Sequence, residues 1–127
     1  MELLRIDRIR LLVGVILLVG LVRQAPAIPT DDLLNSLKPS ADVNDFAGLL
    51  SPAEVQSLET RCRQLRERTG AQLAVVTLKS LDGGQIDDFA NKLFKHWGIG
   101  QKDKRNGLLL IVAIADRKAR IEVGYGL

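Results

Sequence analysis

The chain has 127 residues, of which 46% are hydrophobic and 26% are charged, and its formal net charge is +3. This length suits one domain and is short for two. Residues 1–27 hold four of the eighteen basic residues and two of the fifteen acidic ones, so the rest carries fourteen and thirteen. The basic character therefore belongs to the N-terminal segment, and the remainder gives no global case for nucleic-acid binding.

Residues 1–27 have the pattern of an export signal. Three arginines precede an uncharged apolar run over residues 11–22, and the sequence APA at residues 25–27 has the small-x-small spacing that signal peptidases recognise. The run is close to the ~7–15 residues of a signal peptide and shorter than the ~20 that span a bilayer. The alternative is an uncleaved N-terminal anchor, which would keep the protein in contact with the membrane. Both interpretations predict export, to the periplasm or the extracytoplasmic face of the membrane.

Residues 28–42 contain two prolines and no sustained hydrophobic period, so we expect an extended linker. A helix is expected next, over residues 51–70. Ser51 and Glu54 form a capping box, Pro52 suits the first helical position, and Gly70 ends the helix. One apolar stripe follows this helix, made of Val55, Leu58, Cys62 and Leu65. The single cysteine cannot form an internal disulfide, and on this stripe it is expected to be a small buried hydrophobe.

Two apolar runs, at residues 71–78 and 107–115, are typical of strands buried on both faces. Between them, residues 86–97 place six apolar side chains on one helical face, and Gly98 ends that helix. Alternation over residues 119–126 predicts a half-exposed strand that pairs antiparallel with its predecessor. The order α-β-α-β-β predicts an α/β fold with a right-handed parallel unit.

Two helices do not easily cover both faces of such a sheet. The ending "GYGL" has the form of a turn from a strand into a helix. We therefore expect the C-terminal helices of the domain to be missing, which would leave one apolar face uncovered. Such a face exceeds what soluble monomers usually expose, and predicts aggregation, dimerisation or partial order.

Five separated blocks of the sequence resemble the TPM domain family in order and spacing. They lie in "VNDFAGLLSPAE", "TGAQLAVVTL" and "FKHWGIGQKDKRNGLLLIVAIADRKARIEVGYGL" and cover residues 43–127. The family includes exported bacterial proteins and thylakoid-lumen proteins linked to photosystem repair. The resemblance implies a Rossmann-like α/β/α sandwich, here a partial TPM domain, since an acidic residue and two helices normally follow the last block. It also implies phosphatase activity and divalent-metal binding, as proposed for some members.

The predicted topology brings polar residues to the carboxyl edge of the sheet, where open α/β sheets usually bind ligands. These residues are Asp42, Asp45, Ser80, Asp82, Asp116 and Arg117. Asp45, Asp82 and Asp116 are the candidate ligands for Ca²⁺ or Mg²⁺, which prefer oxygen, and a metal there could bridge to a phosphate. The structural alternative is that these aspartates serve as caps and ordinary turn residues.

The opposite edge offers fewer candidates. The stretch "KHWGIGQKDKRNG" carries four lysines and arginines, and Lys92 lies just before it. These five basic side chains could attract acidic groups, with a solvated loop as the alternative. Its glycines follow a helix and precede a strand, which is the wrong order for a dinucleotide fingerprint. His96 is the only histidine and lies away from Ser80 and Asp116, so no nucleophilic triad can be assembled.

Two functions follow from these features. The first is an exported accessory protein that acts as a binding or assembly module on envelope or membrane proteins, with a divalent metal as a candidate cofactor. The alternative is a metal-dependent phosphatase that hydrolyses phosphomonoesters at the acidic edge. The lack of a nucleophile paired with a base favours the binding module.

Overall fold

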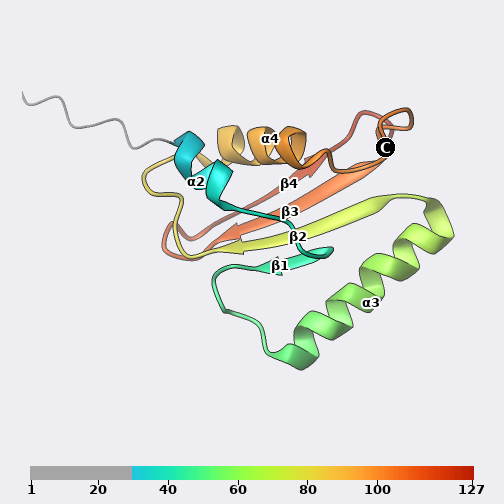
Figure 1. The fold of residues 1–127 in the computed structure, drawn as a ribbon, viewed down its shortest axis with the longest axis horizontal. Coiled ribbons are helices and arrows are strands. Elements are labelled where there is room, and N and C mark those ends of the chain that lie inside the picture. Colours follow the sequence, from blue (N-terminus) through green and yellow to red (C-terminus); the bar gives the residue numbers. More distant parts are fainter. Residues whose placement is uncertain (1–29) are drawn as a thin grey trace, which may run out of the picture.

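The computed structural model describes residues 30–127, and the export signal predicted at residues 1–27 lies outside them. The elements in chain order are α2 (Thr30–Ser36), β1 (Val43–Asp45), α3 (Pro52–Thr69), β2 (Gln72–Leu78), α4 (Ile86–Trp97), β3 (Gly107–Ala113) and β4 (Lys118–Val123). The strands form one sheet in the order β1-β2-β3-β4 (Figure 1). Strands β1, β2 and β3 are parallel, and β4 is antiparallel to β3. Within residues 30–127, no helix is long and apolar enough to cross a membrane.

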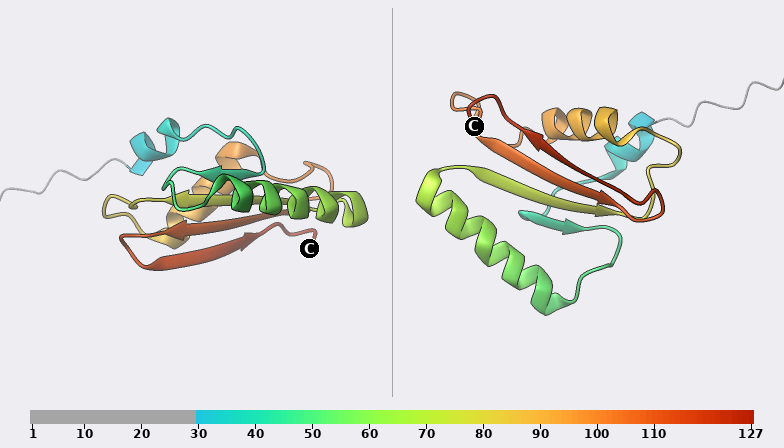
Figure 2. Two further views of the ribbon diagram at one scale, coloured as in Figure 1. Left: turned by 90° about the horizontal axis from the view of Figure 1, so that it is seen from below. Right: turned by 180° about the vertical axis from the view of Figure 1, so that it is seen from behind.

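Helices cover both faces of this sheet, so the α/β class expected from the sequence is confirmed. Helices α2 and α4 lie on one face and α3 lies on the other (Figure 2). The α4 face holds the larger cluster of buried residues, in which Phe89 and Leu93 of α4 pack with Val76, Leu109 and other side chains of the strands. The α3 face holds a smaller cluster of buried residues, centred on Val43, Cys62 and Val75.

The two long helices begin and end where the sequence predicted. Ser51 and Glu54 form the capping box of α3, and Gly70 ends that helix in the left-handed conformation at φ 76°. Gly98 ends α4 in the same way at φ 60°. Glycine is favoured at both positions because a left-handed backbone costs it nothing sterically.

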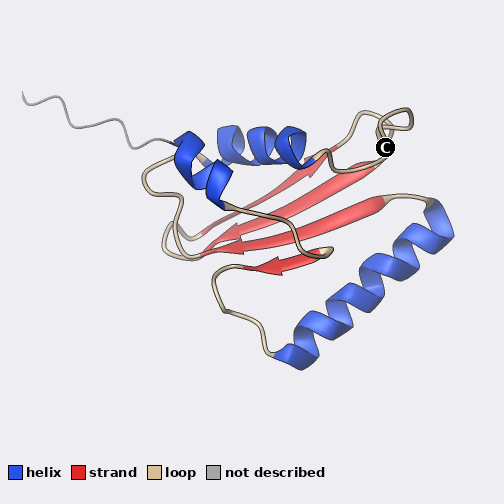
Figure 3. Ribbon diagram, in the orientation of Figure 1, coloured by secondary structure: helices blue, strands red, loops and turns tan. Residues whose placement is uncertain are grey.

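The sequence predicted an extended linker at residues 28–42 and then a domain of two helices and three strands. The structure contains two further elements, one helix and one strand (Figure 3). Residues 30–36 form helix α2, whose Leu34 is buried against the α4 face together with Leu37 just beyond the helix. Residues 43–45 form the short strand β1 beside β2. Neither segment is long enough to show a hydrophobic period, and tertiary packing decides both conformations.

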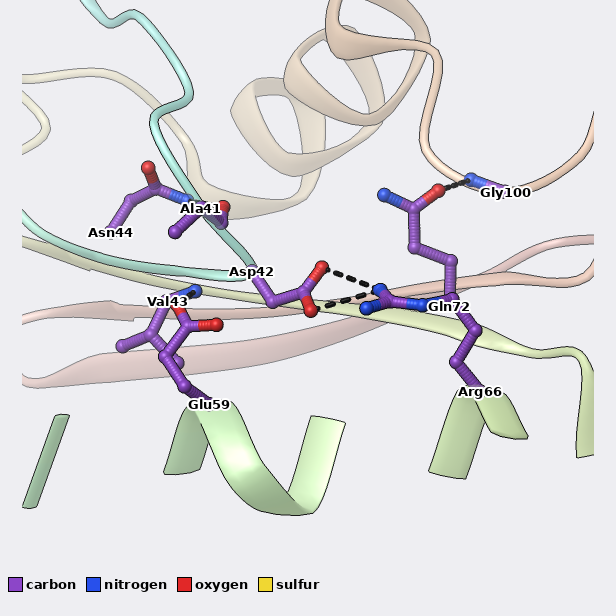
Figure 4. A network of polar contacts seen from close by, with 8 residues as sticks. All are labelled: Ala41, Asp42, Val43, Asn44, Glu59, Arg66, Gln72 and Gly100. Atoms are coloured by element: carbon purple, nitrogen blue, oxygen red, sulfur yellow. Dashed lines mark hydrogen bonds and ion pairs between the residues drawn. The ribbon is translucent and has the colours of Figure 1, made fainter. Parts of the chain in front are cut away.

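Polar contacts fasten α3 to β1 (Figure 4). The Arg66 guanidinium donates to both carboxylate oxygens of Asp42, at 3.0 and 2.9 Å, and Glu59 accepts from the backbone N–H of Val43 at 2.6 Å. On the sheet side, the carbonyl of Asp42 accepts from Val75 N–H at 2.8 Å. These contacts place α3 over β1 and β2 and leave β3 and β4 to one side.

Strand β3 is therefore buried on one face only, and the expectation that it is buried on both faces was wrong. Its residues alternate between buried and half-buried along the strand. The half-buried side chains share a face with Ile121 and Val123 of β4, which are 60% and 48% exposed. These side chains form an apolar strip over β3 and β4, beside α3, and no helix among residues 30–127 lies above it.

Three backbone segments converge at the start of β3. A Cβ added at Gly107 would lie 2.4 Å from the carbonyl oxygen of Ile99, and one added at Gly124 would lie 2.3 Å from that of Arg105. The N–H groups of Gly124 and Gly126 donate to Gly107 and Arg105, each at 2.8 Å. The glycines of the last turn are thus held by these backbone contacts, which require their lack of a side chain.

We predict that Gly107→Ala destabilises the protein by about 3 kcal/mol, because the new methyl meets backbone atoms that cannot rotate away. Gly48→Ala is the matched control. Gly48 has φ 63° with no atom within 4 Å of an added Cβ, so only the left-handed conformation is penalised, by about 1 kcal/mol. Urea unfolding followed by circular dichroism measures both changes. Equal losses of unfolding free energy in the two variants would contradict the close backbone approach at Gly107.

Candidate functional site

The three candidate metal ligands lie at one edge of the sheet. Asp45 is the last residue of β1, Asp82 follows β2, and Asp116 lies in the turn between β3 and β4. Strands β1, β2 and β3 are parallel, with Asp45 opposite Thr77 and Leu78 opposite Ala113, so their carboxyl ends are level. We call this the acidic edge.

Asp45 makes local hydrogen bonds within the acidic edge. Its carboxylate accepts from the Thr77 hydroxyl of β2 and from the backbone N–H groups of Leu49 and Leu50, at 3.0 and 2.9 Å. The Thr77 hydrogen bond, followed by those amides, lowers the pKa of Asp45 against the opposing effect of partial burial. The ionised carboxylate thus holds the loop from β1 towards α3.

The other two aspartates do not join Asp45 in a ligand set. Asp116 accepts from Leu81 N–H at 2.8 Å, which ties the β3–β4 turn to the loop after β2. Asp82 is exposed, has φ 51°, and donates its N–H to the Ser80 hydroxyl. Among residues 30–127, no group of three or more His, Cys, Asp or Glu side chains could hold a metal ion. The hydrogen bonds of Asp45 and Asp116 to loop N–H groups agree with the structural alternative, in which these aspartates act as caps and turn residues.

We predict that Asp45→Asn lowers the free energy of unfolding at pH 7 by roughly 1–3 kcal/mol, because ionised hydrogen-bond acceptors are lost. The lowered pKa in the folded state sets the pH dependence. The carboxylate stabilises the fold above its unfolded pKa of about 3.9, and this contribution disappears as the pH falls through the folded pKa. Wild type and variant should therefore converge in acid. Urea unfolding at several pH values measures this.

Asp82→Asn is the control for that experiment. No hydrogen bond or ion pair of the Asp82 carboxylate is found among the described residues, and Asn tolerates its left-handed backbone. Its stability should equal that of wild type throughout. A loss of unfolding free energy as large as that of Asp45→Asn would contradict the stabilising role assigned to the hydrogen bonds of Asp45.

The opposite edge of the sheet holds a half-open cavity of about 590 Å³. It lies between the second half of α4, the loop that follows α4 and the end of β4. We call it the α4–β4 cavity. Its lining residues are Asn91, Phe94, Lys95, Gly98, Ile99, Gly100, Gln101, Lys102, Arg105, Glu122, Val123, Gly124 and Tyr125.

Positive charge and apolar surface meet in this cavity. Lys95, Lys102 and Arg105 form no ion pair with any other residue in 30–127. The one acidic side chain in the lining, Glu122, is already bonded to Arg120 at 3.1 Å and to the Asn91 amide at 3.2 Å. The cavity therefore has an excess of cations beside a mainly apolar wall that includes Phe94 and Ile99.

The sequence identified the basic residues of this cavity but not the cavity itself. It described a solvated loop and helix-ending glycines, because nothing in the local pattern shows that the loop lies against the end of β4. Asn106 helps to hold the loop there, since its side chain accepts from Gln101 N–H and donates to the Gly70 carbonyl. The feature of the sequence that could have predicted the cavity is the set of glycines at 100, 107 and 124, because glycine permits backbone segments to approach closely.

Three other residues, Cys62, Trp97 and His96, belong neither to the acidic edge nor to the α4–β4 cavity. Cys62 is buried, as predicted, and burial raises the pKa of its thiol. Trp97 is partly buried and donates its indole N–H to the Leu37 carbonyl at 3.3 Å. His96 is exposed.

Comparison with known proteins places this geometry in context. The family model described as TPM domain matches residues 43–127. The N-terminal domain of a protein from P. gingivalis has a TM-score of 0.64 and 39% identity, over 78% of this chain and 61% of that one. The N-terminal domain of the cg2496 protein from Corynebacterium glutamicum has a TM-score of 0.60 and 21% identity, over 72% and 62%. The chain thus spans about three fifths of each structure. No curated protein matches it.

Proposed function

This chain belongs to the TPM domain family, and from that premise we propose that it is a binding module whose α4–β4 cavity takes an anionic group carried on an apolar body. The observation that carries the proposal is a group of three cations, Lys95, Lys102 and Arg105, which form no ion pair within residues 30–127 and lie beside an apolar wall. Small-molecule and peptide sites have this character, with mostly apolar lining and a few polar groups that fix orientation. The volume of about 590 Å³ is also within their usual range of roughly 300–1,000 Å³.

The source of the ligand follows from the expected location. If residues 1–27 direct export, the cavity faces the cell envelope. Its ligand is then a segment of an envelope or membrane protein in which a carboxylate lies next to an apolar side chain. The exposed side chain of Tyr125 stands at the cavity with its aromatic ring available for such a contact.

A phosphatase remains the alternative, and the separation of charges argues against it. A metal at the acidic edge would have to reach a phosphate held by the cations of the α4–β4 cavity. These two places lie at opposite ends of β3, and seven residues of strand span roughly 20 Å. A bridging metal needs contacts of about 2–2.6 Å to both sides. The two features therefore do not combine into one metal-phosphate site.

We predict that 4-phenylbutyrate binds the α4–β4 cavity while its neutral amide binds at least about tenfold more weakly, because only the acid complements the cations. Titration followed by amide NMR shifts should perturb Gly98, Gly100 and Gly124 together. The double variant Lys102→Glu/Arg105→Glu should lose the preference for the acid. Lys79→Glu, an exposed change at the other edge of the sheet, is the control and should keep it. Equal binding of acid and amide to wild type would contradict the proposal.

A divalent metal at the acidic edge remains a prediction from the sequence. Because Asp45, Asp82 and Asp116 do not form a set of three ligands, water would have to supply most of the coordination shell. We expect Ca²⁺ or Mg²⁺ affinity on the order of 1 mM or weaker. Calorimetric titration of wild type, Asp45→Asn and Asp116→Asn tests this. Micromolar affinity in wild type would contradict the expected weak binding, and affinity unchanged in both variants would exclude Asp45 and Asp116 as ligands.

A further inference from the structure

The outer edge of β4 is unpaired in the described part of the chain. Strand β4 is last in the order of the sheet, so one of its two edges has no neighbouring strand among residues 30–127. It has six residues, without proline, and two exposed apolar side chains, Ile121 and Val123. The unpaired N–H and C=O groups of an exposed edge strand are a template for pairing with another strand.

The pairing with β3 decides which backbone groups point outward. Gly124 donates to the Gly107 carbonyl, and hydrogen-bonded pairs alternate along an antiparallel ladder. Glu122 and Arg120 therefore direct their backbone N–H and C=O groups to β3. Ala119, Ile121 and Val123 direct theirs away from the sheet. Any added strand must bond to these three residues.

We propose that this edge pairs with the same edge of a second copy, antiparallel and about a two-fold axis through Ile121. In this register Ile121 lies opposite Ile121 of the second copy, and Ala119 lies opposite Val123 of the second copy. All three outward-facing residues then become hydrogen-bonded pairs. The two sheets join into one continuous sheet, and the apolar strips over β3 and β4 meet across the axis.

Charge selects this register over its neighbours. A two-fold pairing centred on Ile121 sets Arg120 opposite Glu122 of the second copy, and does so twice. A shift that keeps the hydrogen bonds but centres the pair on Arg120 sets arginine opposite arginine, although it also sets Lys118 opposite Glu122 twice. A shift centred on Glu122 sets glutamate opposite glutamate and brings no opposite charges together. Opposite charges across strands stabilise a sheet and like charges destabilise it. The register centred on Ile121 is therefore the one of these three that sets opposite charges across the axis without like charges opposite each other, and this complementarity favours a second copy as the partner.

Disulfide trapping in the full chain tests the pairing. Facing residues in hydrogen-bonded antiparallel pairs have Cα atoms about 5.5 Å apart, within the range that a disulfide bridges. With oxidised glutathione, Ile121→Cys should form a covalent dimer at least about tenfold faster than Leu49→Cys, a matched control in the loop after β1 that is 55% exposed. The native Cys62 is buried in both variants.

Charge changes on the Ile121→Cys background test the register. Arg120→Glu should slow dimer trapping roughly tenfold, because it sets glutamate opposite glutamate twice. Adding Glu122→Arg should restore the rate, since the opposite charges then face each other in reversed order. Circular dichroism verifies that each variant is folded.

The same experiments can overturn the pairing. Trapping of Leu49→Cys as fast as Ile121→Cys would show non-specific association. A folded Ile121→Cys chain that stays monomeric would show that this edge is not used by a second copy. Arg120→Glu without effect, or a swap that does not restore the rate, would exclude this register.

Discussion

The close approach of three backbone segments at the start of β3 is the constraint on which the rest of the structure depends. Gly107 lies against residues 99–100 on one side and exchanges contacts with Gly124 on the other. No side chain fits in either place, so the loop after α4 and the end of β4 are held at one corner of the sheet. That corner forms the wall of the α4–β4 cavity. A bulkier residue there would alter the fold and the cavity together, because the same atoms define both.

A second constraint is the position of α3. Its polar contacts with Asp42 and Val43 hold it over β1 and β2, where Cys62 fills the space above Val75. The helix therefore covers half of its face of the sheet. The remaining half is the apolar strip of β3 and β4, which is bordered by the outer edge of β4, and that edge has no neighbouring strand among residues 30–127. Among residues 30–127, the incomplete cover of this face is a consequence of where one helix is fastened.

The distribution of charge separates structural from candidate binding groups. Carboxylates at the acidic edge accept hydrogen bonds from loops and thereby hold the ends of the strands together. The cations at the other edge form no ion pairs within residues 30–127 and border apolar surface. Unpaired charge beside an apolar wall is available for a ligand, whereas a carboxylate that already accepts several hydrogen bonds has little capacity left. This difference is the reason why the α4–β4 cavity, and not the acidic edge, is the proposed binding site.

The sequence by itself determined the elements whose signals are local. The capping box at Ser51 and Glu54, the glycines at 70 and 98, and the alternation around Ile121 each act within a few residues, so they were readable before the fold was known. Only the tertiary structure revealed β1 and α2, because both are too short to show a hydrophobic period. Strand β1 is stabilised by pairing with β2, and α2 by packing against α4. The tertiary structure also decided the cavity and the roles of the aspartates. Both depend on which distant backbones meet, and a linear pattern does not contain that information.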